Sequence, residues 1–237
     1  MPRNKYQLTP FIIASTMAFG GVSCPKYPVT ENELSRTPRK NRNIEQLALI
    51  LSEGYTADTD VYDRLVSDIS TIRAKDSRVA NVNFRPKDDG SLLVEVSSGA
   101  EENILDGMDF DWNCLNKHFH ATSVKKVIPS IISVRFKGVL DMNKVGTLYK
   151  SVPGVESVMP SLTTGGGSTI CVVRDDQEWH YVFDVGSGDC IVGCMYHELI
   201  YYRADNGKEP ILMETWTKSP DSAQPAWAEI YEKGCKK

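Results

Sequence analysis

The sequence lacks an excess of basic residues. Its 237 residues include 27 lysines and arginines against 31 aspartates and glutamates, which gives a formal net charge of -4. Proteins that bind nucleic acid usually carry a basic surface, so we do not expect nucleic acid as a partner. The one basic run, residues 36–42, precedes the first helical pattern and is interpreted as part of a solvated linker.

The sequence also lacks the local motifs of the common catalytic sites. It contains no Gly-x-Ser-x-Gly turn, and the glycines at 165–167 are not followed by the lysine of a phosphate-binding loop. Cys114 and His118 have the i, i+4 spacing of a helix, but packing of a half-buried helix face explains this pair without an activated thiolate. We therefore assign no catalytic residue and favour a non-catalytic protein.

No apolar run is long enough to cross a bilayer comfortably. The N-terminal apolar stretch, residues 8–19, is short, contains Pro10 and follows Arg3 and Lys5. A basic start, a short apolar segment and small residues after it are typical of an export signal. We therefore predict a signal peptide over residues 1–23, with a buried N-terminal helix as the alternative.

Cys24 lies where such a signal would be cleaved. Val22, Ser23 and Cys24 resemble the lipobox of bacterial lipoproteins, although Gly21 stands where leucine is usual. The resemblance implies that Cys24 carries a lipid and that the protein is anchored to a membrane surface of the cell envelope. An ordinary secreted protein is the alternative. Residues 24–42 are polar and contain three prolines, so they predict a tether.

Hydrophobic periodicity predicts an α+β fold. Helical spacing occurs over residues 43–51, with Asn43 as the cap, and over 60–74. Two β-type runs, 79–84 and 91–96, are interpreted as a hairpin. The next elements expected are a helix at 111–119 capped by Asp111, a strand at 131–136, a helix capped by Asp141 and a strand through Val158.

Residues 131–161 resemble half of a ferredoxin-like α+β sandwich, in the order strand, helix, Pro-Gly-Val turn, strand. The resemblance implies a helical and ferredoxin-like part over residues 43–162, and it implies no function. Residues 163–237 predict an antiparallel sheet, an irregular tail and a cysteine-rich loop, either as a second domain or as one domain with the preceding part. Its expected strands are 170–173, 179–183, 195–203 and 211–216.

Chemically versatile residues are concentrated at 188–198, where two cysteines, a histidine and two carboxylates follow one another closely. In an exported protein, neighbouring cysteines form a disulfide by default, so Cys190 and Cys194 are the candidate structural disulfide. The alternative is a zinc site made by Cys190, Cys194 and His197, for which the fourth ligand would have to come from elsewhere in the fold. We otherwise expect no cofactor.

The six cysteines leave a problem of pairing. If Cys24 carries a lipid, five cysteines remain, and five cannot all pair. One thiol then stays free, or a metal binds several, or Cys24 is not lipidated and forms a disulfide. The sequence does not choose partners for Cys114, Cys171 and Cys235.

The block around the two close cysteines resembles part of a family of uncharacterised exported bacterial proteins. The shared pattern is an aromatic strand, Gly-Asp-Cys, Gly-Cys, a histidine and paired tyrosines, with Ile191 where proline is expected. The likeness covers about the last third of the chain and implies export without a known activity. The matching residues are Tyr181, Phe183, Gly188, Asp189, Cys190, Gly193, Cys194, His197, Tyr201 and Tyr202.

Aromatic residues offer a possible binding surface. Tyr201, Tyr202 and Trp179 suggest a platform for a glycan or peptide, whereas burial in the sheet is the simpler interpretation of alternating aromatics. The sequence thus predicts an exported, lipid-anchored cell-envelope module that binds a protein or glycan ligand. The alternative is a zinc- or thiol-dependent enzyme centred on Cys190, Cys194 and His197.

Overall fold

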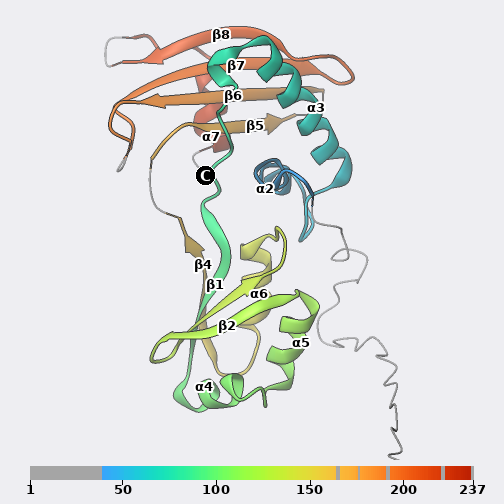
Figure 1. Ribbon diagram of the computed structural model, residues 1–237, viewed down its shortest axis with the longest axis vertical. Helices are drawn as coiled ribbons and strands as arrows, with labels where there is room; N and C mark the ends of the chain where they lie inside the picture. The colour runs from blue at the N-terminus through green and yellow to red at the C-terminus, as the bar shows by residue number, and fades with distance from the viewer. Residues whose placement is uncertain (1–38, 164–165, 176, 191–192, 220–221, 236–237) are drawn as a thin grey trace, which may run out of the picture.

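The computed structural model has two units at opposite ends of an elongated molecule, each built around a four-stranded sheet (Figure 1). It describes residues 39–163, 166–175, 177–190, 193–219 and 222–235. The predicted signal peptide, the lipidation candidate Cys24 and most of the predicted tether lie outside the described residues. Among the helices of the described part, none has the length and apolar character needed to span a membrane.

The first sheet has a ferredoxin-like arrangement. All neighbouring strands are antiparallel. Counted along the chain, two helices connect the first and second strands, and one helix connects the third and fourth. This βαββαβ order confirms the ferredoxin-like part of the predicted α+β fold. In order across the sheet, the strands are β2 (Ala121–Ile128), β3 (Ile131–Phe136), β1 (Asp88–Val96) and β4 (Val155–Leu162). The helices are α4 (Ser98–Leu105), α5 (Phe110–His118) and α6 (Met142–Lys150).

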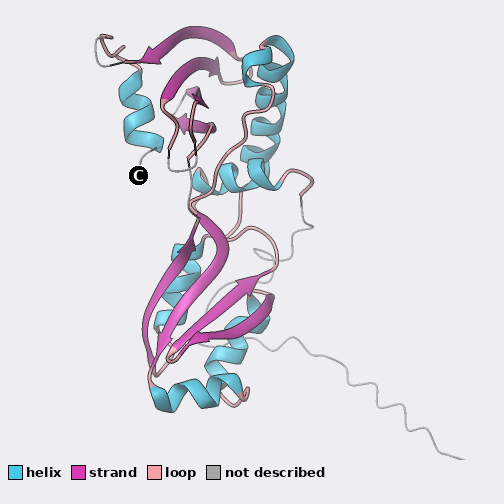
Figure 2. Cartoon of the chain, turned by 60° about the vertical axis from the view of Figure 1, so that its left-hand side comes forward, coloured by secondary structure: helices cyan, strands magenta, loops and turns pink. Residues whose placement is uncertain are grey.

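The core of this unit lies between the sheet and its helices. Leu92 and Val94 alternate along β1 with less buried residues, and they point to the same side of the sheet because successive side chains of a strand alternate between faces. Trp112 of α5 and Tyr149 of α6 complete this core with an edge-to-face contact, their ring centroids 5.1 Å apart. Figure 2 shows the helices behind and beside these strands, so that the front face of the sheet is formed by the strands alone.

The second sheet is also antiparallel, which confirms the C-terminal sheet expected from the sequence. Its order is β5 (Thr169–Arg174), β6 (Glu178–Ser187), β7 (Tyr196–Asp205) and β8 (Ile211–Lys218). Residues of α2, α3 and the short 3-10 helix η1 share a core with one face, and residues of α7 pack on the other. These helices are α2 (Arg42–Ile50), α3 (Thr59–Lys75), η1 (Ser77–Val79) and α7 (Ala228–Cys235).

The ferredoxin-like unit is inserted into the second unit. Helices α2 and α3 precede it in the chain, yet they pack on the C-terminal sheet that follows it. The chain enters the inserted unit near Lys87 and leaves it near Thr163, and these points are adjacent because Thr163 N donates to the Lys87 carbonyl at 2.9 Å. Residues 43–162, which were expected to form one part, are therefore divided between the two units. Helices α2 and α3 share a core with the C-terminal sheet.

The loop between α2 and α3 connects the two units. The Tyr55 side chain packs against the core of the ferredoxin-like unit, with its ring centroid 5.6 Å from that of Phe119. The backbone N–H of Asp141 donates to the Tyr55 carbonyl at 3.0 Å, and Lys144 Nζ donates to the Gly54 carbonyl at 2.9 Å. The two units are therefore joined by these contacts as well as by the two points, near Lys87 and Thr163, where the chain passes between them.

Two of the three predicted helix caps are wrong by two residues. Asn41, not Asn43, caps α2, since its side chain accepts a hydrogen bond from Ile44 N. Asp109, not Asp111, caps α5 and accepts from Trp112 N at 2.8 Å. The third prediction is correct, because Asp141 caps α6.

The predicted hairpin strand at 79–84 is absent. Val79 ends the helix η1, and the buried pair Val79 and Val82 is three residues apart, the spacing of a helical turn and not of a strand. Besides η1, three further elements were not predicted: α4, β2 and α7. In β2 no residue is fully buried, so the sequence of this edge strand lacks the alternating hydrophobic pattern that would have predicted it.

Candidate functional site

Cys190 and Cys194 are joined by a disulfide in the connection between β6 and β7. Their Cα atoms are 4.0 Å apart, and the bond closes a loop with a sequence separation of 4. Cys114 and Cys171 are also disulfide-bonded, and the described residues contain no free cysteine. Neither Cys114 nor the cysteines of the loop therefore offers a thiol for catalysis in this state.

His197, at the start of β7, is held beside this loop by both ring nitrogens. Its Nδ1 lies 2.7 Å from Asp184 Oδ1, and its Nε2 lies 3.2 Å from the carbonyl oxygen of Cys194. The second carboxylate oxygen of the buried Asp184 accepts from the Tyr231 hydroxyl at 2.5 Å. The zinc site considered for Cys190, Cys194 and His197 is not assembled here, because the sulfurs are bonded to each other and neither imidazole nitrogen faces them.

The disulfide packs directly on the backbone of β6. A Cβ atom at Gly186 would overlap Cys194 Sγ, and a Cβ atom at Gly166 would overlap the backbone of Gly193. Glycine is therefore required at Gly186 by close approach. The glycines let the loop pack closely against β6, and His197 bridges Asp184 and the carbonyl of Cys194 in this loop.

Replacing both Cys190 and Cys194 with serine is expected to lower the free energy of unfolding by about 2 kcal/mol, because closing so short a loop restricts the unfolded chain only modestly. Urea unfolding under oxidising conditions measures the change. Met195→Ser, an exposed neighbour in the same connection, is the matched control and is expected to change stability by less than about 0.5 kcal/mol. Equal effects in the two variants would contradict a stabilising role for the disulfide.

The aromatic platform considered for Tyr201, Tyr202 and Trp179 is not exposed. Their exposed fractions are only 6%, 3% and 4%. The Tyr202 hydroxyl donates to Asp76 Oδ2 at 2.6 Å, which ties β7 to η1. The Tyr201 ring stacks on Trp227, with centroids 5.0 Å apart. These residues therefore stabilise the two faces of the second sheet instead of presenting a ligand surface.

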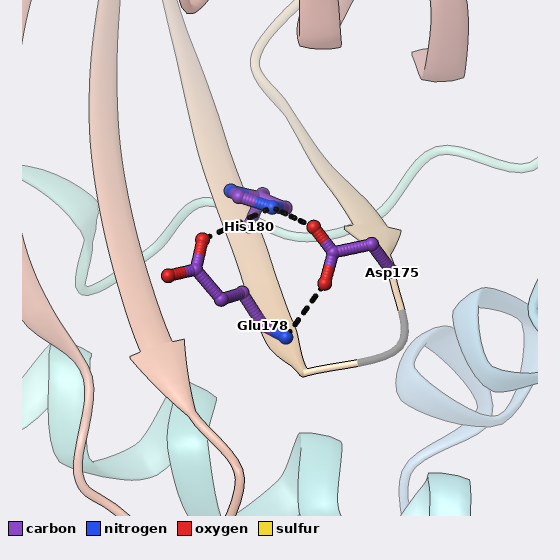
Figure 3. A group of neighbouring side chains, drawn as sticks. All are labelled: Asp175, Glu178 and His180. Carbon is purple, nitrogen blue, oxygen red and sulfur yellow. Dashed lines mark hydrogen bonds and ion pairs between the residues drawn. The ribbon is translucent and has the colours of Figure 1, made fainter.

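A cluster that the sequence analysis did not identify lies at the β5–β6 turn. Asp175, Glu178 and His180 each place one potential metal-ligand atom within 4.8 Å of the others (Figure 3). His180 Nε2 lies 3.2 Å from Asp175 Oδ2 and 3.9 Å from Glu178 Oε2. The imidazole is 9% exposed, whereas the Asp175 side chain is 57% exposed, so the cluster opens to solvent on the carboxylate side.

Each member of this cluster is oriented by a further partner. Hydrogen bonds from the backbone N–H groups of Gln177 and Glu178, followed by the bond with His180, lower the pKa of Asp175 to about 2. Glu178 Oε1 lies 3.5 Å from Arg203 Nη1, and His180 Nδ1 lies 2.8 Å from the Tyr201 hydroxyl. Glu178 and His180 are two residues apart in a strand, so their spacing in the sequence could have predicted that both lie on one face of the sheet.

Comparison with known proteins assigns no family. No family model, curated protein or solved structure matches the chain. A ferredoxin-like arrangement hosts many functions, so it describes a fold and carries no activity with it. The expected likeness to exported bacterial proteins stays a prediction, and the function has to be inferred from the residues themselves.

Proposed function

We propose that the protein is an exported, lipid-anchored module of the cell envelope that binds a protein or glycan ligand and performs no catalysis. The state of the cysteines is the observation that best supports export, since disulfides persist in oxidising compartments and are rare in the cytosol. All four cysteines whose side chains are described are disulfide-bonded: Cys114, Cys171, Cys190 and Cys194. The lipid anchor requires in addition that Cys24 is not the disulfide partner of Cys114 or Cys171.

The surroundings of His197 support a non-catalytic role. A base that activates a nucleophilic side chain needs that side chain within hydrogen-bonding reach. The partners of the two His197 nitrogens are the Asp184 carboxylate and a backbone carbonyl of the disulfide loop, and neither is a nucleophile. The zinc- or thiol-dependent enzyme considered as the alternative would need the Cys190–Cys194 disulfide to be reduced.

The proposed anchor would leave the folded part free to reach a ligand. Arg39 belongs to the folded part, since its guanidinium donates to the Ala57 carbonyl and to Thr59 Oγ1 at 3.2 and 3.1 Å. Residues 25–38 separate Cys24 from this point, and a fully extended segment of that length would span at most about 50 Å. A tether of this length suits a binding module that stands away from the membrane surface.

Lipidation is tested by expressing the full chain in a bacterial host that is fed an alkyne-modified fatty acid. We expect the label on the wild-type chain, in the membrane fraction, and neither the label nor the membrane location for Cys24→Ser. Ser23→Ala, which keeps a small residue before the cysteine, is the matched control and should retain the label. An unlabelled wild-type chain would contradict the anchor, and one retained in the cytosol would contradict export.

The thiol- or zinc-dependent alternative is tested by alkylating the exported chain without a reductant and mapping its peptides. A peptide that joins Cys190 to Cys194, with neither thiol alkylated, is the expected result. Alkylation of both residues in the native protein would contradict a structural disulfide and would favour the thiol- or zinc-dependent alternative.

A further inference from the structure

We propose that Asp175, Glu178 and His180 form a binding site for one divalent transition-metal ion, with zinc bound more tightly than manganese. The site lies at the turn between β5 and β6, and it is separate from the disulfide loop. It goes beyond the proposed function and does not depend on export or on the lipid anchor.

The distances from His180 Nε2 to the two carboxylates are close to those that a metal requires. Zinc binds nitrogen and carboxylate oxygen at about 2.0–2.2 Å, which places neighbouring ligand atoms of a tetrahedral site about 3.3–3.6 Å apart. His180 Nε2 lies 3.2 Å from Asp175 Oδ2 and 3.9 Å from Glu178 Oε2. Small rotations of the two carboxylates, both at the solvent side of the imidazole, would bring the three donors around one ion.

The partners around the cluster are those expected of a metal site. Ligating histidines commonly use the second ring nitrogen for a hydrogen bond that fixes the ring, and ligating carboxylates are themselves hydrogen-bonded. Here the Tyr201 hydroxyl contacts His180 Nδ1, so Nε2 is the nitrogen that faces the carboxylates. Asp175 Oδ1 accepts from two backbone N–H groups, which leaves Oδ2 directed at the imidazole.

The donor set selects among metals. One imidazole and two carboxylates suit a first-row divalent ion, whereas magnesium and calcium prefer oxygen donors alone. The general order of affinities for such sites places zinc above manganese. Three protein ligands and the exposure of Asp175 leave the remaining coordination positions to water. The contacts between His180 and the two carboxylates are also those of a simple ion pair. The test must therefore distinguish a metal site from an ion pair.

Isothermal titration of the full, oxidised, chelator-treated chain with zinc chloride provides that test. We expect one equivalent of zinc to bind, and Asp175→Asn and Glu178→Gln each to weaken binding at least tenfold. Asp175→Asn retains an amide oxygen that can accept from the backbone of the turn, so the local fold should survive. Glu209→Gln, which alters an exposed carboxylate paired with Lys75, is the matched control and should not change the affinity.

Cobalt substitution and Tyr201→Phe supply a second readout. Cobalt bound by nitrogen and oxygen lacks the intense thiolate charge-transfer absorption that ligation by Cys190 or Cys194 would produce. Tyr201→Phe removes the partner of Nδ1 and is expected to weaken zinc binding about tenfold. If the three residues form only an ion pair, the chain will not bind zinc. A chain that binds no zinc would therefore overturn the proposal. Unchanged affinity in both carboxylate variants, or a thiolate band, would overturn it as well.

Discussion

Asp68→Ala is expected to lower the free energy of unfolding by about 3 kcal/mol, because it leaves a partly buried guanidinium and a buried hydroxyl without their common acceptor. Asp68, on α3, is 4% exposed, and its Oδ2 accepts from Arg64 Nε at 2.6 Å. The Tyr181 hydroxyl of β6 donates to the same oxygen. Burial and the neighbouring carboxylate raise the pKa of Tyr181 well above its ordinary value, which keeps this hydroxyl a donor.

The cost lies at the lower end of the range for breaking a buried ion pair, because the Arg64 side chain is 21% exposed and keeps some contact with water. Tyr181→Phe removes a single hydrogen bond and leaves Asp68 with Arg64, so it should cost about 1.5 kcal/mol. Urea unfolding, followed through the tryptophan fluorescence, measures both changes.

Asp63→Ala is the matched control for this prediction. Asp63 is an exposed aspartate on the same helix, and its loss should change stability by less than about 0.5 kcal/mol. An equal effect of Asp63→Ala and Asp68→Ala would mean that the contact between α3 and β6 contributes nothing. It would also weaken the inference that α3 belongs to the second unit, since Asp68 and Tyr181 are 113 residues apart in the chain.

Strongly periodic segments of the fold could be predicted from the sequence. Val61, Leu65, Ile69 and Ile72 mark one helix face, and all four are buried in α3. The strand expected at 131–136 coincides with β3. These predictions succeed because each element carries its own hydrophobic pattern, which depends only on neighbouring residues.

The partner of α3 could not be predicted, because the periodicity of a helix gives its buried face and not what covers that face. Sequence order suggested that α2 and α3 accompany the segment that follows them. Packing on β6 instead brings together residues more than a hundred positions apart, as Asp68 and Tyr181 demonstrate. Weakly patterned elements were missed for another reason, since α4 buries only Ile104.

In the candidate sites, too, local features could be predicted and long-range contacts could not. Cys190 and Cys194 lie close in sequence, so their pairing could be expected from local spacing. The surroundings of His180 depend on strand register, which pairs His180 with Arg203 and Val182 with Tyr201. A shift of one residue in this register would move the neighbouring side chains to the opposite face, and a single sequence does not fix it.

Trp112→Ala is expected to have the largest effect on stability, a loss of about 4 kcal/mol, because it opens a large cavity in the core of the ferredoxin-like unit. Trp112 is completely buried and contacts Tyr149. Its indole Nε1 has no hydrogen-bond partner among the described residues. Trp112→Phe therefore removes no hydrogen bond and should cost only about 1–2 kcal/mol for the smaller side chain.

Phe110→Ala is the matched control on the same helix, since Phe110 is 63% exposed and its loss should cost less than about 0.5 kcal/mol. Hydrogen exchange, resolved by peptide, measures where the stability is lost. Because the two units have separate cores, Trp112→Ala should increase exchange mainly in β1 to β4, and Asp68→Ala mainly in α3 and β6. Equal increases throughout the chain in both variants would instead mean that the contacts of Tyr55 and the adjacent chain crossings couple the two units into one cooperative structure.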